Sequence, residues 1–166
     1  AAVKHATVAR PAVTAQTLVA ARSQPLARIV PPLTSRSAIL IDGTTGKVLF
    51  WKHPHDRVPI ASVTKIMTAL IAIEHLKPHD IVDVDPLATR VPPNREGLKP
   101  HEKVEAWKLL YASMLYSGND SALALGIAVA GSRPKFIAMM NARARALQMN
   151  DTHFNSASGV IDTGNY

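Results

Sequence analysis

The sequence predicts a mixed α/β (α+β) domain in which one β-hairpin precedes a series of helices. Two apolar runs, 38–42 and 47–51, flank the loop Gly43-Thr44-Thr45-Gly46, a pattern typical of a hairpin. An almost continuous apolar run at 66–76 predicts a helix that is buried nearly all round. Apolar residues recur at helical spacing in three further segments, 104–116, 120–130 and 134–148.

Two weaker patterns complete the predicted domain. A short strand is expected near 81–84, and an irregular proline-rich stretch follows at 85–100. In the last helix, charged Arg143 and Arg145 are expected to face outward. The residues expected to form its buried face are Phe136, Ile137, Met140, Ala144 and Leu147.

Composition and charge limit the classes of function. With 166 residues, 47% apolar content and no cysteine, the chain can bury one good core without disulfides, which fits a protein outside the cytoplasm. The net charge of +7 is concentrated before residue 42, where no acidic residue occurs. These charges are scattered among small residues without aromatics, so we expect no nucleic-acid binding but attraction to an anionic envelope surface.

Residues 1–36 form a basic segment rich in Ala, Val, Pro and Arg, which predicts a flexible leader before the domain at 37–166. The apolar run 17–21 ends at Arg22 and is too short for the core of a signal peptide. We therefore expect that a signal was removed or lies upstream, and we expect no transmembrane helix.

Ser62 and Lys65 form the most informative pattern, because they set a hydroxyl and an amine one turn apart at the start of the most apolar helix. A buried lysine is rare unless it is paired or its pKa is lowered, and a lowered pKa makes an amine useful as a base. The alternative is a simple helix cap at Ser62 with Lys65 reaching to water. The same spacing in Ser132 and Lys135 is read as ordinary capping, because proline occupies the first turn.

A second motif, Ser117-Gly118-Asn119, lies between two predicted helices. By itself it is consistent with an ordinary turn between helices, with Gly118 ending one helix and Asn119 or Asp120 capping the next. Together with Ser62 and Lys65, however, it makes up two of the three motifs shared by penicillin-binding proteins and class A β-lactamases.

The chain thus resembles the serine-type D-alanyl-D-alanine carboxypeptidases, the low-molecular-mass penicillin-binding proteins of the peptidase S11 family. The resemblance runs from about Ser37 to Tyr166. It implies a transpeptidase fold shared with β-lactamases, in which a helical subdomain packs on an antiparallel sheet. The segments that carry it, in order, are 38–42, 45–49, 59–65, 97–100, 117–120 and 149–154.

The resemblance also implies roles for individual residues. Ser62 would be the nucleophile that forms an acyl-enzyme, Lys65 the general base, and Ser117 a proton relay to the leaving amine. Asn119 and Gly118 would bind substrate. The substrate would be a peptidoglycan stem ending in D-Ala-D-Ala, β-lactams would be covalent inhibitors, and no cofactor or metal would be needed. The protein would act in cell-wall biogenesis in the periplasm, on the outer face of the cytoplasmic membrane or in the wall, with possible peripheral membrane association.

One motif of the family is missing, since Lys-Thr-Gly occurs nowhere in the 166 residues. We therefore expect a chain truncated at its C-terminus that lacks the last strands of the sheet. The 166 residues alone are expected to be inactive, because the missing strand would supply an oxyanion donor and the groups that recognise the substrate carboxylate.

Several alternatives remain open from the sequence. A D-alanyl-D-alanine endopeptidase would share these motifs, and a genuine end at Tyr166 would favour a non-catalytic wall-binding relative. A β-lactamase or esterase of the same superfamily is a weaker possibility. A zinc site would need ligands among His53, His55, His75 and His79, but Pro78 interrupts the second pair and no convincing acidic ligand accompanies them.

Overall fold

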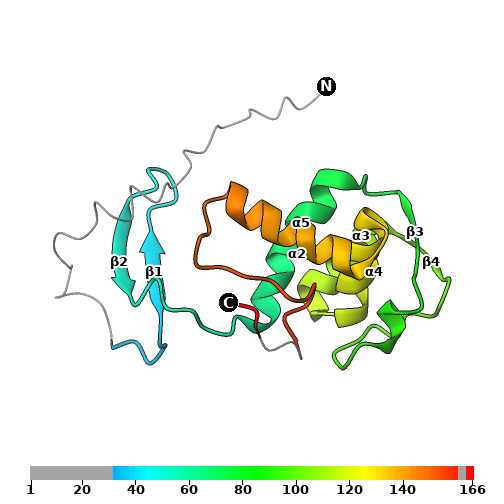
Figure 1. The fold of residues 1–166 in the computed structure, drawn as a ribbon, viewed down its shortest axis with the longest axis horizontal. Helices are drawn as coiled ribbons and strands as arrows, with labels where there is room; N and C mark the ends of the chain where they lie inside the picture. Colours follow the sequence, from blue (N-terminus) through cyan, green and yellow to red (C-terminus); the bar gives the residue numbers. More distant parts are fainter. Residues whose placement is uncertain (1–31, 161–163) are drawn as a thin grey trace, which may run out of the picture. The chain divides into compact units, whose positions relative to one another are not determined.

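The computed structural model describes residues 32–160 and 164–166 (Figure 1). The chain divides into two compact units, Ala1–Asp56 and Arg57–Tyr166. Most of the leader predicted at 1–36 lies outside the described residues, so its flexibility stays a prediction.

The first unit contains the predicted β-hairpin, which is confirmed. Strands β1 (Ala38–Ile41) and β2 (Val48–Lys52) pair antiparallel, with an irregularity in register after Leu40. The loop between them is organised by Asp42, whose carboxylate accepts hydrogen bonds from the Thr44 and Thr45 amides at 3.0 and 2.7 Å. The bonds from Thr45, and then that from Thr44, hold the pKa of Asp42 below its usual value.

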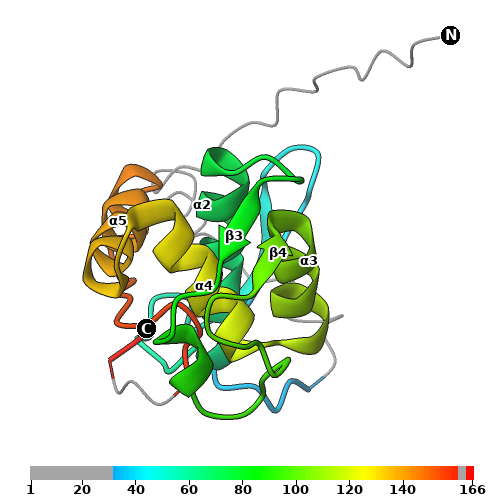
Figure 2. The same cartoon turned by 90° about the vertical axis from the view of Figure 1, so that its right-hand side faces the viewer.

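The second unit is mainly helical, and its elements appear in Figures 1 and 2. A 3₁₀ turn, η1, leads directly into α2, and a π-helical turn, η3, continues α3 toward α4. The helical elements are η1 (Ala61–Thr64), α2 (Lys65–His75), η2 (Ala88–Arg90), α3 (Ala106–Tyr111), η3 (Ala112–Tyr116), α4 (Asn119–Ala130) and α5 (Arg133–Ala146).

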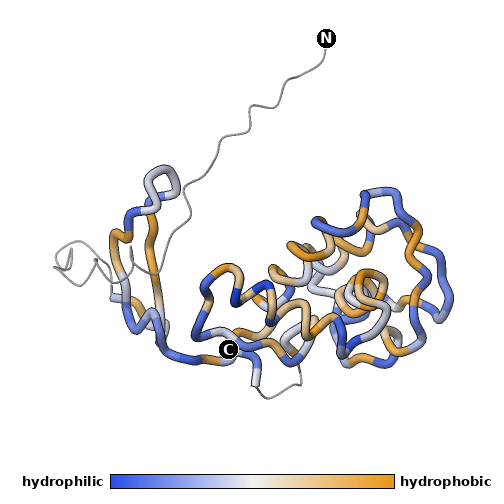
Figure 3. Tube along the Cα trace, turned by 45° about the horizontal axis from the view of Figure 1, so that its top comes forward, coloured by the Kyte–Doolittle hydropathy of each residue, from blue (hydrophilic) through white to orange (hydrophobic). Residues whose placement is uncertain are grey.

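Helix α4 is the centre of this unit and contacts α2, α3 and α5 (Figure 2). Every residue from Asn119 to Ile127 is buried, and from Ala122 onward the stretch consists of small and apolar side chains. Figure 3 shows the hydropathy of the chain along its trace. The approach of α5 is close: a Cβ atom on Gly126 would lie 2.5 Å from the Phe136 ring. The predicted buried face of α5 is confirmed for Phe136, Met140 and Ala144, but Leu147 is 42% exposed.

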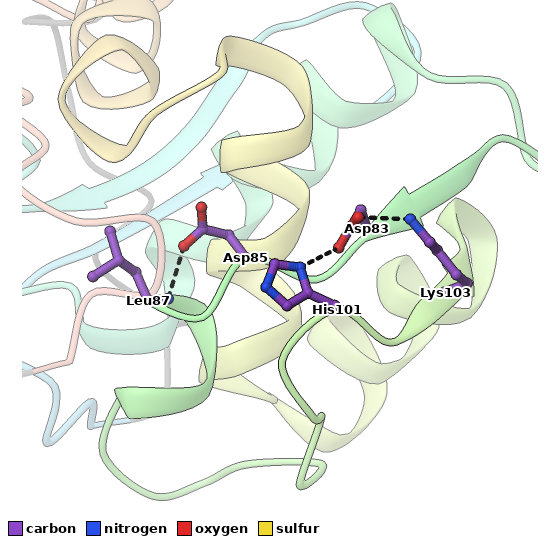
Figure 4. A network of polar contacts seen from close by, with 5 residues as sticks. All are labelled: Asp83, Asp85, Leu87, His101 and Lys103. Atoms are coloured by element: carbon purple, nitrogen blue, oxygen red, sulfur yellow. Dashed lines mark hydrogen bonds and ion pairs between the residues drawn. The ribbon is translucent and has the colours of Figure 1, made fainter.

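A small antiparallel sheet is formed by β3 (Ile81–Asp83) and β4 (Lys103–Glu105), which buries Val82 in the core. On its exposed side, Lys103 Nζ lies 2.6 Å and His101 Nδ1 3.2 Å from the carboxylate of Asp83 (Figure 4). The hydrogen bond from Lys103 is the main reason that the pKa of Asp83 is lowered. A similar arrangement lies nearby at Glu105. Its side-chain hydrogen bonds, first to His79 and then to Lys108, lower the pKa of Glu105 to about 2.

The structure also differs from the sequence prediction at the start of one helix and in the burial of another. The helix expected from residue 104 begins only at Ala106, because residues 103–105 pair with β3 instead. The helix expected to be buried nearly all round leaves Ile66 and Ile73 59% and 63% exposed. An apolar sequence run therefore predicted this helix correctly but not which of its faces is covered.

No single helix in the described ranges is both long and apolar enough to cross a membrane; α4 and α5 reach that length and composition only as a pair bent by 86°.

The close packing of α4 on α5 gives a testable expectation for Gly126→Ala. Intrinsic propensity favours alanine in a helix by about 1 kcal/mol, but the added methyl group would overlap the Phe136 ring. We expect the overlap to dominate and to lower the free energy of unfolding by about 1–3 kcal/mol, measured by thermal or urea unfolding. Combining the change with Phe136→Leu should recover part of the loss, and a more stable single variant would contradict this packing.

Candidate active site

The site begins where η1 passes into α2, and it brings Ser62 and Lys65 together as predicted. Ser62 lies in the 3₁₀ turn and is half-buried, whereas Lys65 is the first residue of α2 and only 2% exposed. The Lys65 Nζ atom lies 3.1 Å from Ser62 Oγ. The alternative of Lys65 reaching to water is therefore wrong.

Three oxygen atoms surround the Lys65 amine. Besides Ser62 Oγ, the Nζ atom lies 2.8 Å from Asn119 Oδ1 and 3.2 Å from the carbonyl oxygen of Ser158. The amide and backbone oxygens can only accept hydrogen bonds, whereas the serine hydroxyl can also donate. If the amine is uncharged, its two N–H groups satisfy the two carbonyl-type oxygens, and its lone pair then faces the Ser62 hydroxyl. This is the geometry that a base needs to remove the serine proton.

Burial also shifts the protonation equilibrium of the Lys65 amine toward its uncharged form. Desolvation lowers the pKa of its amine below the ordinary value of 10.5, because the charged form loses its hydration. No carboxylate is among the hydrogen-bond partners of Nζ in the described part of the chain, so no negative charge in direct contact opposes this shift. A larger fraction of uncharged amine is therefore available near neutral pH than in a solvated lysine.

Asn119 is held at the first position of α4, where it is 1% exposed. Its side-chain Nδ2 donates to the carbonyl of Pro92 at 3.1 Å, and its backbone N–H donates to the carbonyl of Asn94 at 2.9 Å. Because Pro92 accepts from the nitrogen end of the amide, the oxygen end must face Lys65. The orientation of Asn119 is thus set by the 92–94 segment.

Ser117 lies at the turn between η3 and α4, as predicted, with a half-buried side chain. Among the described residues its hydroxyl forms no hydrogen bond to Ser62 or Lys65, so its predicted role as a relay stays a prediction. Its backbone is left-handed at φ 63°, and Ala61, directly before Ser62, is similar at φ 46°. Left-handed non-glycine residues are uncommon and concentrate at functional sites, and here they flank two of the predicted site residues.

Gly118 lies at the N-cap of α4 with an ordinary extended backbone. A Cβ atom there would come within 3.1 Å of Ser121 Oγ and 3.2 Å of Asp120 Oδ1, so this glycine allows close packing around the turn. Its contact with substrate stays a prediction.

The sequence did not predict the contribution of residues 156–159. The hydroxyl of Thr68 donates to the Ala157 carbonyl at 2.7 Å, and Lys65 contacts the next carbonyl. Gly159, with φ +74°, passes so close to η1 that a Cβ atom would lie 1.8 Å from the Ala61 carbonyl oxygen. This segment therefore covers the turn that carries Ser62 with backbone groups. In the sequence, only the glycine signals this close approach.

Other candidate groups do not gather at this site. The second serine and lysine pair has Ser132 at the N-cap of α5 with proline in the first turn, and Lys135 is exposed. Within residues 32–160 and 164–166, no group of three or more His, Cys, Asp or Glu side chains is arranged to hold a metal ion. His79 instead lies 2.7 Å from Glu105, and His75 contacts the Ile71 carbonyl.

A serine hydroxyl beside a buried amine, covered by an amide and backbone carbonyls, defines a candidate site for nucleophilic acyl transfer. Comparison with known proteins identifies the family within this class of acyl-transfer proteins. The D-alanyl-D-alanine carboxypeptidase family, peptidase S11, matches residues 21–166. The chain is 34% identical over 137 residues to the D-alanyl-D-alanine carboxypeptidase DacF of Bacillus subtilis, covering 80% of this chain and 35% of DacF.

Two further proteins show the range of the family. A D-alanyl-D-alanine endopeptidase of Pseudomonas aeruginosa is 33% identical over 132 residues, covering 77% of this chain and 42% of the endopeptidase. The crystal structure of penicillin binding protein 6B from Escherichia coli aligns with a TM-score of 0.77 and 30% identity, over 85% of this chain and 48% of that one.

The chain belongs to the peptidase S11 family of D-alanyl-D-alanine carboxypeptidases and has the fold of penicillin-binding proteins over the part that it covers. It spans less than half the length of the two curated relatives. The transpeptidase fold expected from the sequence is thereby confirmed.

The close approach at Gly159 predicts that Gly159→Ala is strongly destabilising. Left-handed strain alone costs about 1–2 kcal/mol, and here the methyl group would also collide with a backbone carbonyl, which cannot move aside like a flexible side chain. Gly131→Ala is the matched control, because Gly131 has φ +75° but open space around it. We expect unfolding measurements to show a loss for Gly159→Ala at least twice that of the control; equal losses would contradict the close contact.

Proposed function

We propose that this chain carries the nucleophile half of the active site of a serine-type D-Ala-D-Ala carboxypeptidase, which removes the terminal D-alanine from peptidoglycan stem peptides. The observation that carries the proposal is the Lys65 amine, buried and 3.1 Å from Ser62 Oγ in a chain of the S11 family. The names of relatives such as DacF support the substrate class.

The proposed acylation step uses the hydrogen bonds described above. Lys65 Nζ takes the proton of Ser62, and Oγ attacks the carbonyl carbon of the D-Ala–D-Ala bond. The tetrahedral intermediate collapses when the C–N bond breaks, with the D-alanine amine taking a proton. Ser117 is proposed to relay that proton from the Lys65 ammonium, because the turn holding it adjoins Asn119, which contacts Lys65. Water then hydrolyses the acyl-serine ester and releases the shortened stem.

The remaining proposed roles rest on the family resemblance, with support from the contact between Asn119 and Lys65. Asn119 holds Lys65 and, with Gly118, is proposed to contact the substrate backbone. The Ser62 N–H is proposed as one donor to the oxyanion. A β-lactam would acylate the same serine, in keeping with the penicillin-binding relative. Since peptidoglycan lies outside the cytoplasmic membrane, we also propose an extracytoplasmic location.

A D-alanyl-D-alanine endopeptidase is the second candidate, supported by the Pseudomonas aeruginosa relative. Both activities would use the same acylation chemistry and differ in the leaving group. Assaying the complete protein with a linear peptide ending in D-Ala-D-Ala and with a crosslinked muropeptide would separate them, because only the first releases free D-alanine.

The proposed nucleophile predicts a covalent penicillin adduct. Incubation of the complete protein with benzylpenicillin should add the mass of one penicillin, and peptide mapping should place it on Ser62. Ser62→Ala should abolish the adduct, whereas Ser132→Ala, in the second serine and lysine pair, should retain it. An adduct that persists in Ser62→Ala would overturn the assignment.

The proposed base predicts how acylation depends on pH. Because burial lowers the pKa of Lys65, the acylation rate should rise with pH and level off at an apparent pKa below the ordinary lysine value of 10.5. Lys65→Arg keeps a cation that cannot lose its proton, so acylation should fall by about 10²–10⁴-fold. Lys135→Arg is the control and should match the wild type. Wild-type rates in the Lys65 variant would exclude this lysine as the base.

A further inference from the structure

Next to Asn119 lies a buried carboxylate that none of the proposed catalytic steps uses. Asp120 is 1% exposed, and both of its oxygens accept hydrogen bonds from backbone N–H groups only. The donors are Glu96 at 3.0 Å and Ser121 at 2.9 Å to Oδ1, with Gly97 at 2.9 Å and Leu98 at 3.2 Å to Oδ2. Three of the four donors belong to one loop, 96–98, which precedes Asp120 by more than twenty residues.

In that loop Leu98 packs against the hydrophobic core, but the stretch before it is exposed. Residues 93–97 are all exposed, and Pro92 lines a cavity of about 330 Å³ together with Leu123 and Ser158. An exposed chain segment beside a cavity is not fixed by side-chain burial, so its position depends on its hydrogen bonds. The three bonds to the Asp120 carboxylate are the strongest of these, because each involves a charged acceptor.

The same loop determines the orientation of Asn119. The Pro92 carbonyl accepts from Asn119 Nδ2 at 3.1 Å, and the Asn94 carbonyl accepts from the Asn119 backbone N–H at 2.9 Å. Asn119 Oδ1 in turn lies 2.8 Å from Lys65 Nζ. Asp120 therefore connects to the amine through the 92–98 loop and Asn119, without touching the reacting atoms.

We propose that Asp120 is a positioning residue that holds the 92–98 loop against α4 and thereby keeps the oxygen of the Asn119 amide directed at Lys65. If the loop moves, the Pro92 carbonyl no longer fixes the amide, and the nitrogen end of Asn119 can turn toward the amine. An N–H group facing Lys65 competes for the lone pair that the Ser62 proton requires. This inference rests on the proposed function, since it concerns the same acylation.

The test measures the acylation rate constant for benzylpenicillin in the complete protein and its Asp120→Asn variant. An amide at this position offers one acceptor oxygen and turns its NH₂ group toward other N–H donors. Some of the hydrogen bonds that hold the 92–98 loop are therefore lost. We expect acylation to slow by about tenfold or more. Met140→Ala, in the buried face of α5, is the control for general destabilisation and should acylate at the wild-type rate.

A double-mutant cycle separates positioning from a structural role. If Asp120 acts through Asn119, Asp120→Asn should cause no further slowing in an Asn119→Ala background. If it only stabilises the fold, the two effects should multiply. A multiplicative result, or a wild-type rate in the single variant, would overturn the inference while leaving the proposed function intact. Failure of the wild-type protein to acylate would instead overturn the proposed function.

A milder variant keeps the inference testable if Asp120→Asn does not fold. Gly97 has φ +85° and open space around it. Gly97→Ala therefore strains the backbone of the 92–98 loop, but its methyl group meets no neighbouring atom. Gly131→Ala introduces the same strain outside the loop. Acylation should be several-fold slower in Gly97→Ala than in Gly131→Ala, and equal rates would contradict the role of the loop.

Discussion

The burial of one lysine amine organises the second unit of this protein. A charged amine at 2% exposure without a carboxylate in contact is unfavourable, so the surrounding structure must supply oxygen acceptors and must favour the uncharged form. Asn119 provides one acceptor from the start of α4, and Ser158 provides another from near the end of the chain. Helix α4, the 92–98 loop and the 156–159 segment are all arranged around this requirement.

Local backbone strain accompanies the arrangement. Ala61, which directly precedes Ser62, and Ser117 both adopt left-handed conformations. Glycine would adopt these angles more easily, so retaining a side chain there costs about 1–3 kcal/mol that the surrounding packing must offset. Gly159 shows the opposite case, where the backbone approach leaves no room for any side chain.

The sequence predicted those parts of the site that depend on side chains at short spacing. Ser62 and Lys65 meet because three residues make one turn, and the apolar run after them correctly indicated burial of the amine. Asn119 was expected from the family resemblance. The Ser158 carbonyl was missed, because every residue has a carbonyl and only the tertiary fold selects one. The strand β4 was also missed, since three residues that begin an amphipathic pattern fit a helix as well as a strand.

The oxygens around Lys65 come from widely separated parts of the chain. Asn119 follows it by 54 residues and Ser158 by 93, so the amine can lose its water only after both distant segments have docked. During synthesis the N-terminal part emerges first, with the Lys65 amine still hydrated. If the proposed function holds, reactivity arises as one of the last consequences of folding, and an incomplete chain is spared acylation by any ester or strained amide that it meets before then.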